Sequence, residues 1–439
     1  MLKESVSILK VPEILLPCNK VDMKKWATIA CDQFTSNQSY WDQVASEVGD
    51  HPSTLKITFP EFYLGKIDEA RKIQDIHHEM GKYLEENLFV LHHGMILVER
   101  EIDHGTRYGL LTAIDLEDYD YTRTSTSWIR ATEGTVAERI PPRIKIREGA
   151  PLEIPHILVL IDDDQKKLIE PLISIKDTLP VLYDFDLMMN SGHVRGYSLA
   201  DPKIENQILS VVAEAQSDNS IERKYGSVND HSRIIFAIGD GNHSLATAKA
   251  IWENHKQEWG MDHPARYAMV EIENLHDSAL LFEPIHRVIF NKKNSVVKQL
   301  EHQYGNDIEI VTHVDHESLF KDIDATPEGI QSFGILENGK AYKATFLNPP
   351  SGLCVGSVQQ FLDTWKAKGG FEEIDYIHGT DDVINIAQSE NNASFYLPPV
   401  QKNGFFQSII KDGALPRKTF SMGEAHEKRF YIECRRILK

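Results

Sequence analysis

The chain has 439 residues, a length that predicts two or three domains. It carries 47 lysines and arginines against 66 aspartates and glutamates, so its formal net charge is −19, which argues against a protein that coats nucleic acid by neutralising phosphates. Hydrophobic residues make up 41% of the chain and charged residues 26%, a balance that excludes a disordered or collagen-like chain.

Three features of the sequence favour a soluble, cytoplasmic protein. No apolar run approaches the ~18 residues of a membrane span. The first residues show neither a signal-peptide nor a transit-peptide pattern. The four cysteines, at positions 18, 31, 354 and 434, lack the CxxC spacing of a thiolate zinc site and do not form a disulfide framework, so we expect mostly buried apolar thiols.

Helical and strand-like patterns alternate from end to end, which predicts a mixed α/β (α+β) architecture. An amphipathic helix is expected at 66–87, followed by strands at 94–100 and 107–116. A hairpin is expected at 158–169, where two short apolar runs flank an acidic turn. Further along, we expect strands at 233–238, 267–272 and 288–290, and helices at 245–259, 295–304 and 358–366.

The segment Asp240-Gly241-Asn242-His243-Ser244 joins a predicted strand to a predicted helix. Glycine permits backbone conformations closed to other residues, and the first N–H groups of a helix can bind an anion. Asp240 is a candidate ligand for a metal or a hydroxyl, and His243 is a candidate donor to a phosphoryl oxygen or a proton relay. A plain strand-to-helix turn, with Asn242 or Ser244 as N-cap, explains the same residues equally well.

Basic residues are concentrated near the middle of the chain, at Arg123, Arg130, Arg139, Arg143, Lys145 and Arg147. The alternation at 143–147 (RIKIR) is typical of a strand that turns three cations to one face. Such a face either binds an anionic ligand or protects the edge of a sheet from pairing. Glu133 lies among these cations and is a candidate general base toward a substrate hydroxyl, or a salt-bridge partner of the arginines.

The last part of the chain carries a second basic cluster, at Arg417, Lys418, Lys428, Arg429, Arg435, Arg436 and Lys439. Within it, the segment 415–419 (LPRKT) combines a proline, two cations and a hydroxyl, which suits a loop that grips an anion. A solvated tail is the alternative.

Five segments carry a resemblance to a known family: 128–147 (WIRATEGTVAERIPPRIKIR), 238–247 (IGDGNHSLAT), 283–287 (EPIHR), 375–379 (DYIHG) and 415–419 (LPRKT). Together they resemble the uncharacterised family called domain of unknown function 1015. A more distant resemblance is to the ParB/sulfiredoxin-like nucleotide-binding superfamily, which includes ADP-dependent free serine kinase. It implies a ParB/sulfiredoxin-like nucleotide-binding core with additional α/β elements within 1–290. A C-terminal α/β region, 291–439, would contribute the loop Pro416–Thr419 to the site.

The resemblance implies that Glu133 is the base for the substrate hydroxyl, although Thr132 stands where the family has histidine. It places Asp240 and His243 in the catalytic turn, with Asp240 as a metal ligand. Together with the basic segment, it leads us to expect nucleotide or phosphate binding by Arg130, Arg143, Lys145, Arg147, Gly241, Asn242, Ser244 and Thr247. The expected substrate-binding residues are Tyr376, His378, Lys418 and Thr419.

One departure from the superfamily concerns Ser244, which stands where an arginine would pair with phosphate. Lys249, or the cations of 143–147, are candidate replacements. The assignments favour a small-molecule kinase or phosphotransferase that uses ADP or ATP with Mg²⁺ on a hydroxyl metabolite, with free serine suggested by resemblance alone. A nucleotide-gated regulatory protein and a phosphoserine-type phosphatase are the alternatives. Without a helix-turn-helix signature or a basic DNA face, we expect no nucleic-acid partner, and no membrane partner either.

Overall fold

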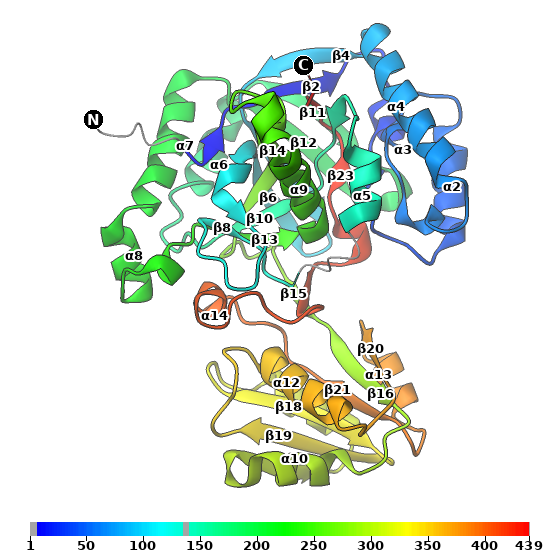
Figure 1. Ribbon diagram of the computed structural model, residues 1–439, viewed down its shortest axis with the longest axis vertical. Coiled ribbons are helices and arrows are strands. Elements are labelled where there is room, and N and C mark those ends of the chain that lie inside the picture. Colours follow the sequence, from blue (N-terminus) through cyan, green and yellow to red (C-terminus); the bar gives the residue numbers. More distant parts are fainter. Residues whose placement is uncertain (1–6, 135–139, 439) are drawn as a thin grey trace. The chain divides into compact units, whose positions relative to one another are not determined.

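The computed structural model describes residues 7–134 and 140–438, which form two compact units (Figure 1). The first unit comprises Met1–Leu280 and Gly423–Lys439, and the second comprises Leu281–Met422. From the sequence we expected one boundary, between the regions 1–290 and 291–439. The structure divides the chain differently, because the last residues of the chain return to the first unit. No helix in the described ranges is both long and apolar enough to cross a membrane.

The first unit is built on a mixed sheet with the strand order β11-β12-β5-β6-β14-β10-β13-β8-β7, and β1 adds to β6. These strands are β1 (Leu9–Lys10), β5 (Ile96–Ile102), β6 (Gly105–Asp115), β7 (Tyr119–Asp120), β8 (Ile129–Arg130), β10 (Leu158–Ile161), β11 (Val181–Asp186), β12 (His193–Ser198), β13 (Phe236–Asp240) and β14 (Tyr267–Asn274). β10 is parallel to β14 and antiparallel to β13, whereas β8 is parallel to both β13 and β7. Short strand pairs lie outside this sheet: β2 (Glu13–Pro17) with β4 (Phe89–His93), β3 (Thr28–Ile29) with β23 (Phe430–Tyr431), and β9 (Leu152–Glu153) with β24 (Arg435–Arg436).

Helices and loops cover both faces of this sheet. The helices are α1 (Met23–Trp26), α2 (Gln38–Val48), α3 (Thr54–Ile57), α4 (Glu69–Glu85), α5 (Ile140–Arg147), α6 (Glu170–Ile175), α7 (Pro202–Ala215), α8 (Asp218–Tyr225) and α9 (Asn242–Trp259). Adjacent residues of β5 pack on opposite faces of the sheet. Leu97 belongs to one hydrophobic cluster with Trp252 of α9, whereas Ile96 and Val98 belong to another with Trp26. The expected mixed α/β class is confirmed, and the main strands are buried on both faces.

The helix expected at 66–87 is confirmed as α4. Its N-cap is Asp68, whose carboxylate accepts a hydrogen bond from the Arg71 N–H. Its buried residues, Ile76, Met80 and Tyr83, are three or four positions apart and form one apolar stripe.

The hairpin expected at 158–169 is wrong. The first run, Leu158–Ile161, forms β10, which lies between β13 and β14 and is buried at all four residues. The second run leads into α6 instead of forming a strand. Asp163 fixes the intervening turn because its carboxylate accepts hydrogen bonds from the Lys167 and Leu168 N–H groups at 2.6 and 2.8 Å.

The second unit has its own antiparallel sheet, in the order β17-β19-β18-β21-β16-β20. Its strands and helices are β15 (Phe282–Pro284), β16 (His286–Phe290), α10 (Val296–Tyr304), β17 (Ile308–His313), α11 (His316–Asp324), β18 (Gln331–Glu337), β19 (Lys340–Phe346), α12 (Cys354–Ala367), β20 (Glu373–Ile377), α13 (Asp381–Ile386), β21 (Ala393–Tyr396), α14 (Phe405–Asp412) and β22 (Phe420–Met422). Phe361 of α12 packs against Phe395 of the sheet, while Leu319 of α11 joins a separate cluster with Leu336.

Buried ion pairs hold the C-terminal residues in the first unit. The Arg429 Nε lies 2.6 Å from Glu271 Oε2, and its Nη2 lies 2.9 Å from Glu433 Oε2. Its Nη1 donates to the Pro155 carbonyl at 2.7 Å. All three charged residues are buried, so this guanidinium compensates two carboxylates that water does not reach.

We expect the substitution Arg429→Met to lower the free energy of unfolding by about 3–5 kcal/mol, because it leaves Glu271 and Glu433 buried without their cation. Urea unfolding at pH 7 measures the change. The matched control is Lys167→Met, since the Lys167–Glu214 pair is 41% and 56% exposed and contributes at most about 1 kcal/mol. Equal losses in the two variants would contradict the assignment of Arg429 as a buried clamp.

Candidate functional site

The segment that carries Glu133 lies against the Asp240 turn. β8 and β13 are parallel neighbours, so their carboxyl ends meet at the same edge of the sheet. Beyond that edge, the Thr132 Oγ1 donates to the Ile238 carbonyl at 2.6 Å and accepts from the Asn242 Nδ2 at 3.4 Å. The structure thus brings the predicted base segment and the predicted phosphate turn together, although more than a hundred positions separate them in the sequence.

The turn has the backbone that only glycine adopts easily. Gly241 has φ +80° and ψ +25° and directly precedes α9. A Cβ atom there would lie 3.1 Å from both Cα and Cγ1 of Ile157. No side chain caps α9, so neither Asn242 nor Ser244 acts as the N-cap that a plain turn would have. The Asn242 Oδ1 is buried and finds no hydrogen-bond partner within the described residues.

We expect Gly241→Val to destabilise the protein by more than Gly226→Val. Both positions are left-handed, with φ +80° and +76°, so each valine is strained by about 1–3 kcal/mol. Gly226 has no atom within 4 Å of a built Cβ, whereas Gly241 has the Ile157 backbone, which makes Gly226→Val the matched control. Urea unfolding of the two variants measures the difference, and equal stabilities would contradict the tight contact.

A buried lysine from the C-terminal residues faces the turn. The Lys428 Nζ lies 3.1 Å from Asp240 Oδ2, and Asp240 Oδ1 accepts from the Gly241 N–H at 2.8 Å. Burial acts to raise the pKa of Asp240, but the Lys428 ammonium, with smaller help from His156, holds this pKa below its ordinary value. From sequence, Lys428 was indistinguishable from the rest of a basic tail, yet it is only 6% exposed.

This environment does not fit Asp240 as a protein ligand for Mg²⁺. One carboxylate oxygen already faces an ammonium group, and the other accepts a backbone N–H. Mg²⁺ prefers several oxygen ligands and water, not a site next to a cation. Within the described ranges, the convergent group of His and acidic residues is Asp103, His426 and Glu427, which does not include Asp240.

We expect Asp240→Asn and Lys428→Met to be coupled by about 0.5–3 kcal/mol in a double-mutant cycle at pH 7. The folded-state pKa of Asp240 is lowered, so the stability it contributes is present above its unfolded value of about 3.9 and is lost as the pH falls through the folded value. The coupling should therefore stay constant from pH 7 to pH 5 and shrink below about pH 4. Additive variants at pH 7 would contradict the ion pair.

The predicted strand at 143–147 is wrong, because these residues end the helix α5. Its prolines, at positions 141 and 142, occupy the first turn, where a helix tolerates proline. On a helix, Arg143 and Arg147 share a face, and the exposed Lys145 does not. Arg143 pairs with Glu61, and Arg147 Nη2 lies 2.5 Å from Glu153 Oε2. Arg139 lies outside the described residues.

Two other cationic residues that were candidates for phosphate binding form contacts within the protein instead. The Arg130 guanidinium donates to the carbonyls of Ser127, Asp230 and Arg233 at 2.8–3.3 Å. Lys249, the candidate replacement for the missing arginine, donates to the Leu116 carbonyl at 2.8 Å and pairs with Glu253. These contacts argue against a phosphate-binding role for either side chain.

The helices α5 and α9 pack against each other (Figure 1). Residues of both helices line a cavity of about 390 Å³. Arg143, Arg147, Ser244 and Thr247 line it, so four predicted binding residues share one cavity. Glu133, Asp240 and His243 are not among its lining residues. Sequence reasoning missed His156 and Tyr431, which also line this cavity and are buried.

The four expected substrate-binding residues lie in the second unit. Tyr376 is on β20, where its ring lies 5.2 Å from the Arg287 guanidinium, and His378 follows the strand. Lys418 has φ +59°, and the Thr419 Oγ1 donates to the Pro416 carbonyl at 2.5 Å. Their contribution to a site with Glu133 stays a prediction.

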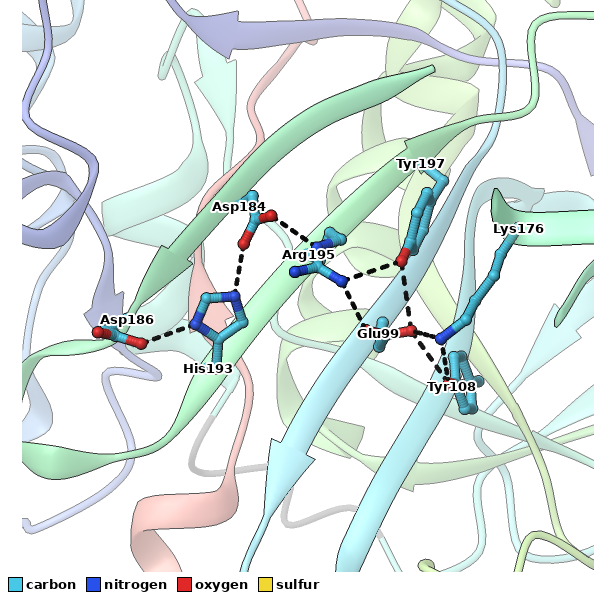
Figure 2. A network of polar contacts seen from close by, with 8 residues as sticks. All are labelled: Glu99, Tyr108, Lys176, Asp184, Asp186, His193, Arg195 and Tyr197. Carbon is cyan, nitrogen blue, oxygen red and sulfur yellow. Dashed lines mark hydrogen bonds and ion pairs between the residues drawn. The ribbon is translucent and has the colours of Figure 1, made fainter. Parts of the chain in front are cut away.

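A second polar cluster covers part of the first unit's sheet (Figure 2). His193 contacts Asp184 through Nε2 at 2.6 Å and Asp186 through Nδ1 at 2.7 Å. Arg195 bridges Asp184 at 2.7 Å and Glu99 at 3.4 Å. Partial burial acts to lower the pKa of His193, but the bonds to Asp186 and Asp184 hold it above its ordinary value. Each charged side chain in this cluster contacts one of opposite charge, which is typical of a network that stabilises a sheet.

The chain belongs to the family described as Protein of unknown function (DUF1015), whose model matches residues 15–365. The family expected from the five segments is therefore confirmed. None of the curated proteins matches the chain.

Among solved structures, the chain is similar to free serine kinase in complex with AMP (12% identity, TM-score 0.39, covering 73% of this chain and 90% of that one). It is also similar to a conserved hypothetical protein from Pyrococcus furiosus (12%, 0.33, 73% and 90%) and to SbnI with C-terminal truncation from Staphylococcus aureus (9%, 0.33, 73% and 82%). Similarities at this level carry no conclusion about what this chain binds.

Proposed function

We propose that the chain is a small-molecule phosphotransferase that moves a phosphoryl group from ADP or ATP to a hydroxyl metabolite. The observation that carries the proposal is the contact of Thr132 with Ile238 and Asn242, which sets the Glu133 segment beside the uncapped start of α9. Phosphoryl transfer asks for an anion site and a base for the attacking hydroxyl, and this edge of the sheet supplies both. The adenine nucleotide and serine, as the first acceptor to test, come from the family resemblance.

The groups at this edge have complementary roles in the proposal. Glu133 accepts the proton of the acceptor hydroxyl. The hydroxyl oxygen bonds to the terminal phosphorus of the nucleotide, and the bond from that phosphorus to the leaving phosphate oxygen breaks. The backbone N–H groups and dipole of α9 bind the phosphate. The buried ammonium of Lys428 pairs with Asp240 at the start of the turn and offsets a carboxylate that would otherwise repel the phosphate. His243 donates to a phosphoryl oxygen.

We expect Glu133→Gln to lower the rate of phosphoryl transfer by ~10² to 10⁴-fold, the usual contribution of a general base. Its nucleotide affinity should be equal or higher, because the carboxylate repels phosphate. The assay follows transfer from ADP and ATP to a panel of hydroxyl metabolites led by serine, with phosphoserine hydrolysis in parallel. Glu148→Gln is the matched control, because this exposed glutamate pairs only at the surface with His255.

A thermal-shift series with ADP, ATP, AMP and CTP, with and without Mg²⁺, measures the affinity in the same variants. A ligand at one hundred times its Kd stabilises the folded state by about 2.7 kcal/mol. Full transfer activity in Glu133→Gln would remove this residue from the mechanism. Stabilisation by none of the nucleotides at millimolar concentration would rule out the nucleotide site. Hydrolysis without transfer would favour the phosphatase, and stabilisation by CTP alone would favour the regulatory alternative.

A further inference from the structure

The strand β4 (Phe89–His93) forms a free edge of the first unit. It pairs with β2 and with no other strand in the described part of the chain. It lies at the outer margin of that unit (Figure 1), and two of its apolar residues are exposed, Val90 at 56% and Leu91 at 49%. None of the residues assigned to phosphoryl transfer belongs to β4, so an inference about this strand is independent of the proposed function.

The hydrogen bonds of β2 determine which backbone groups of β4 face outward. Leu91 lies directly opposite Leu15 of β2. The Leu15 N–H donates to the Cys434 carbonyl at 2.7 Å, and the Leu15 carbonyl accepts from the Cys434 N–H at 2.9 Å, so both groups point away from Leu91. Because bonded and non-bonded pairs alternate along antiparallel strands, Phe89 and His93 are in the same phase as Leu91. The backbone N–H and C=O groups of these three residues therefore point away from β2.

The two ends of the β2–β4 pair show the complementary phase. The Cys18 N–H donates to the Leu88 carbonyl at 2.8 Å, and the Gly94 N–H donates to the Pro12 carbonyl at 3.1 Å. Leu88 and Gly94 are each three positions from Leu91, as strict alternation requires. No described residue bonds to the outward backbone groups of β4, which form an open row of donors and acceptors. Such a row is a template for a further strand.

The outer strands of the two large sheets carry features that discourage such pairing. In the first unit, β7 has only two residues, and β11 carries Asp184 and Asp186 together with a register shift. In the second unit, β17 carries Glu309, and β20 carries Glu373 and Asp375. By contrast, the sequence of β4 (FVLHH) has no carboxylate, lysine, arginine or proline, and its register with β2 is regular. Short length, charged residues and bulges protect an edge, so β4 is an unprotected one.

This strand is complementary to itself. A two-fold axis at Leu91 would place Leu91 opposite its own copy, Phe89 opposite His93 and Val90 opposite His92. All outward backbone groups of both strands would then be paired, and the exposed apolar side chains would cover one another. The chain carries a net charge of −19, yet no fixed like charges meet across this strand pair.

We propose that β4 pairs antiparallel with β4 of a second copy of the chain, about a two-fold axis at Leu91. The interface is isologous, since the same five residues serve both copies. A single strand pair is small for a protein interface, so the dimer forms in a concentration-dependent equilibrium.

Sedimentation velocity of the full chain, from micromolar to millimolar concentration, measures the self-association. The measurement is made at pH 8, above the ordinary histidine pKa of about 6.5. Leu91→Lys and Leu91→Asp should each weaken the dimer by at least about 10-fold, because each puts two like charges directly opposite each other. An equimolar mixture of these two variants should associate again. The matched control is Val181→Lys, which changes an exposed valine on the other free edge, β11, and should leave the dimer unchanged.

Disulfide cross-linking locates the two-fold axis independently. In a hydrogen-bonded antiparallel pair, directly opposite Cα atoms are about 5.5 Å apart, within the range of a disulfide, so Leu91→Cys should cross-link two chains under mild oxidation with diamide. Val90 and its copy would be diagonal neighbours about 7–8 Å apart, so Val90→Cys should cross-link much less. The unchanged chain, with its four native cysteines, gives the background. Far-UV circular dichroism and urea unfolding check that each variant is folded.

Several outcomes would overturn the proposal. A chain that stays monomeric at millimolar concentration would exclude the dimer. A dimer that persists in folded Leu91→Lys and Leu91→Asp variants would place the interface on another surface. Mixed variants that do not associate, or equal cross-linking of Leu91→Cys and Val90→Cys, would exclude a two-fold axis at Leu91.

Discussion

The buried guanidinium of Arg429 ties the last residues of the chain to the central sheet of the first unit. Its pairs with Glu271 of β14 and with Glu433 leave three charges without water, which a protein tolerates only when each charge is compensated in place. The preceding residue, Lys428, is thereby held against Asp240. The candidate site therefore combines an edge made by two parallel strands with a cation that the C-terminal residues contribute.

Long periodic segments could be predicted from the sequence, and short ones could not. The helices α4 and α9 and the strands β5 and β6 extend over enough residues for one period to dominate, so their expected positions are confirmed. The five residues of 143–147 fit either a strand with alternating cations or a helix with two arginines four apart. The prolines before them suit an extended approach and a first helical turn equally, so local pattern could not decide. The hairpin predicted around β10 was wrong for a related reason. All four residues of β10 are buried, so their pattern does not indicate which strands lie beside them.

The local part of the candidate site was accessible from sequence, and its long-range partners were not. The Asp240–Ser244 segment could be recognised by its glycine between a predicted strand and a predicted helix. Glu133 could be recognised by its place among cations. Lys428 and Tyr431 reach this region from the other end of the chain, with 275 positions between Tyr431 and His156. Composition gives no signal for such contacts, because a lysine at 6% exposure and a lysine in a tail look alike in sequence. The roles of Tyr376, His378, Lys418 and Thr419, and the distant superfamily relation, stay predictions.

Ser244, where the expected superfamily pattern has an arginine, belongs to the wall of the cavity beside α9. Its hydroxyl oxygen lies 3.0 Å from the His156 Nε2. An arginine at this position would extend its long side chain into the same space. A small hydroxyl side chain keeps the cavity open and continues the hydrogen-bond chain from Tyr431. The buried Lys428 ammonium pairs with Asp240 at the turn, so this carboxylate is compensated without a cation at position 244. A small side chain at position 244 therefore suits both the open cavity and a turn whose charge Lys428 already balances.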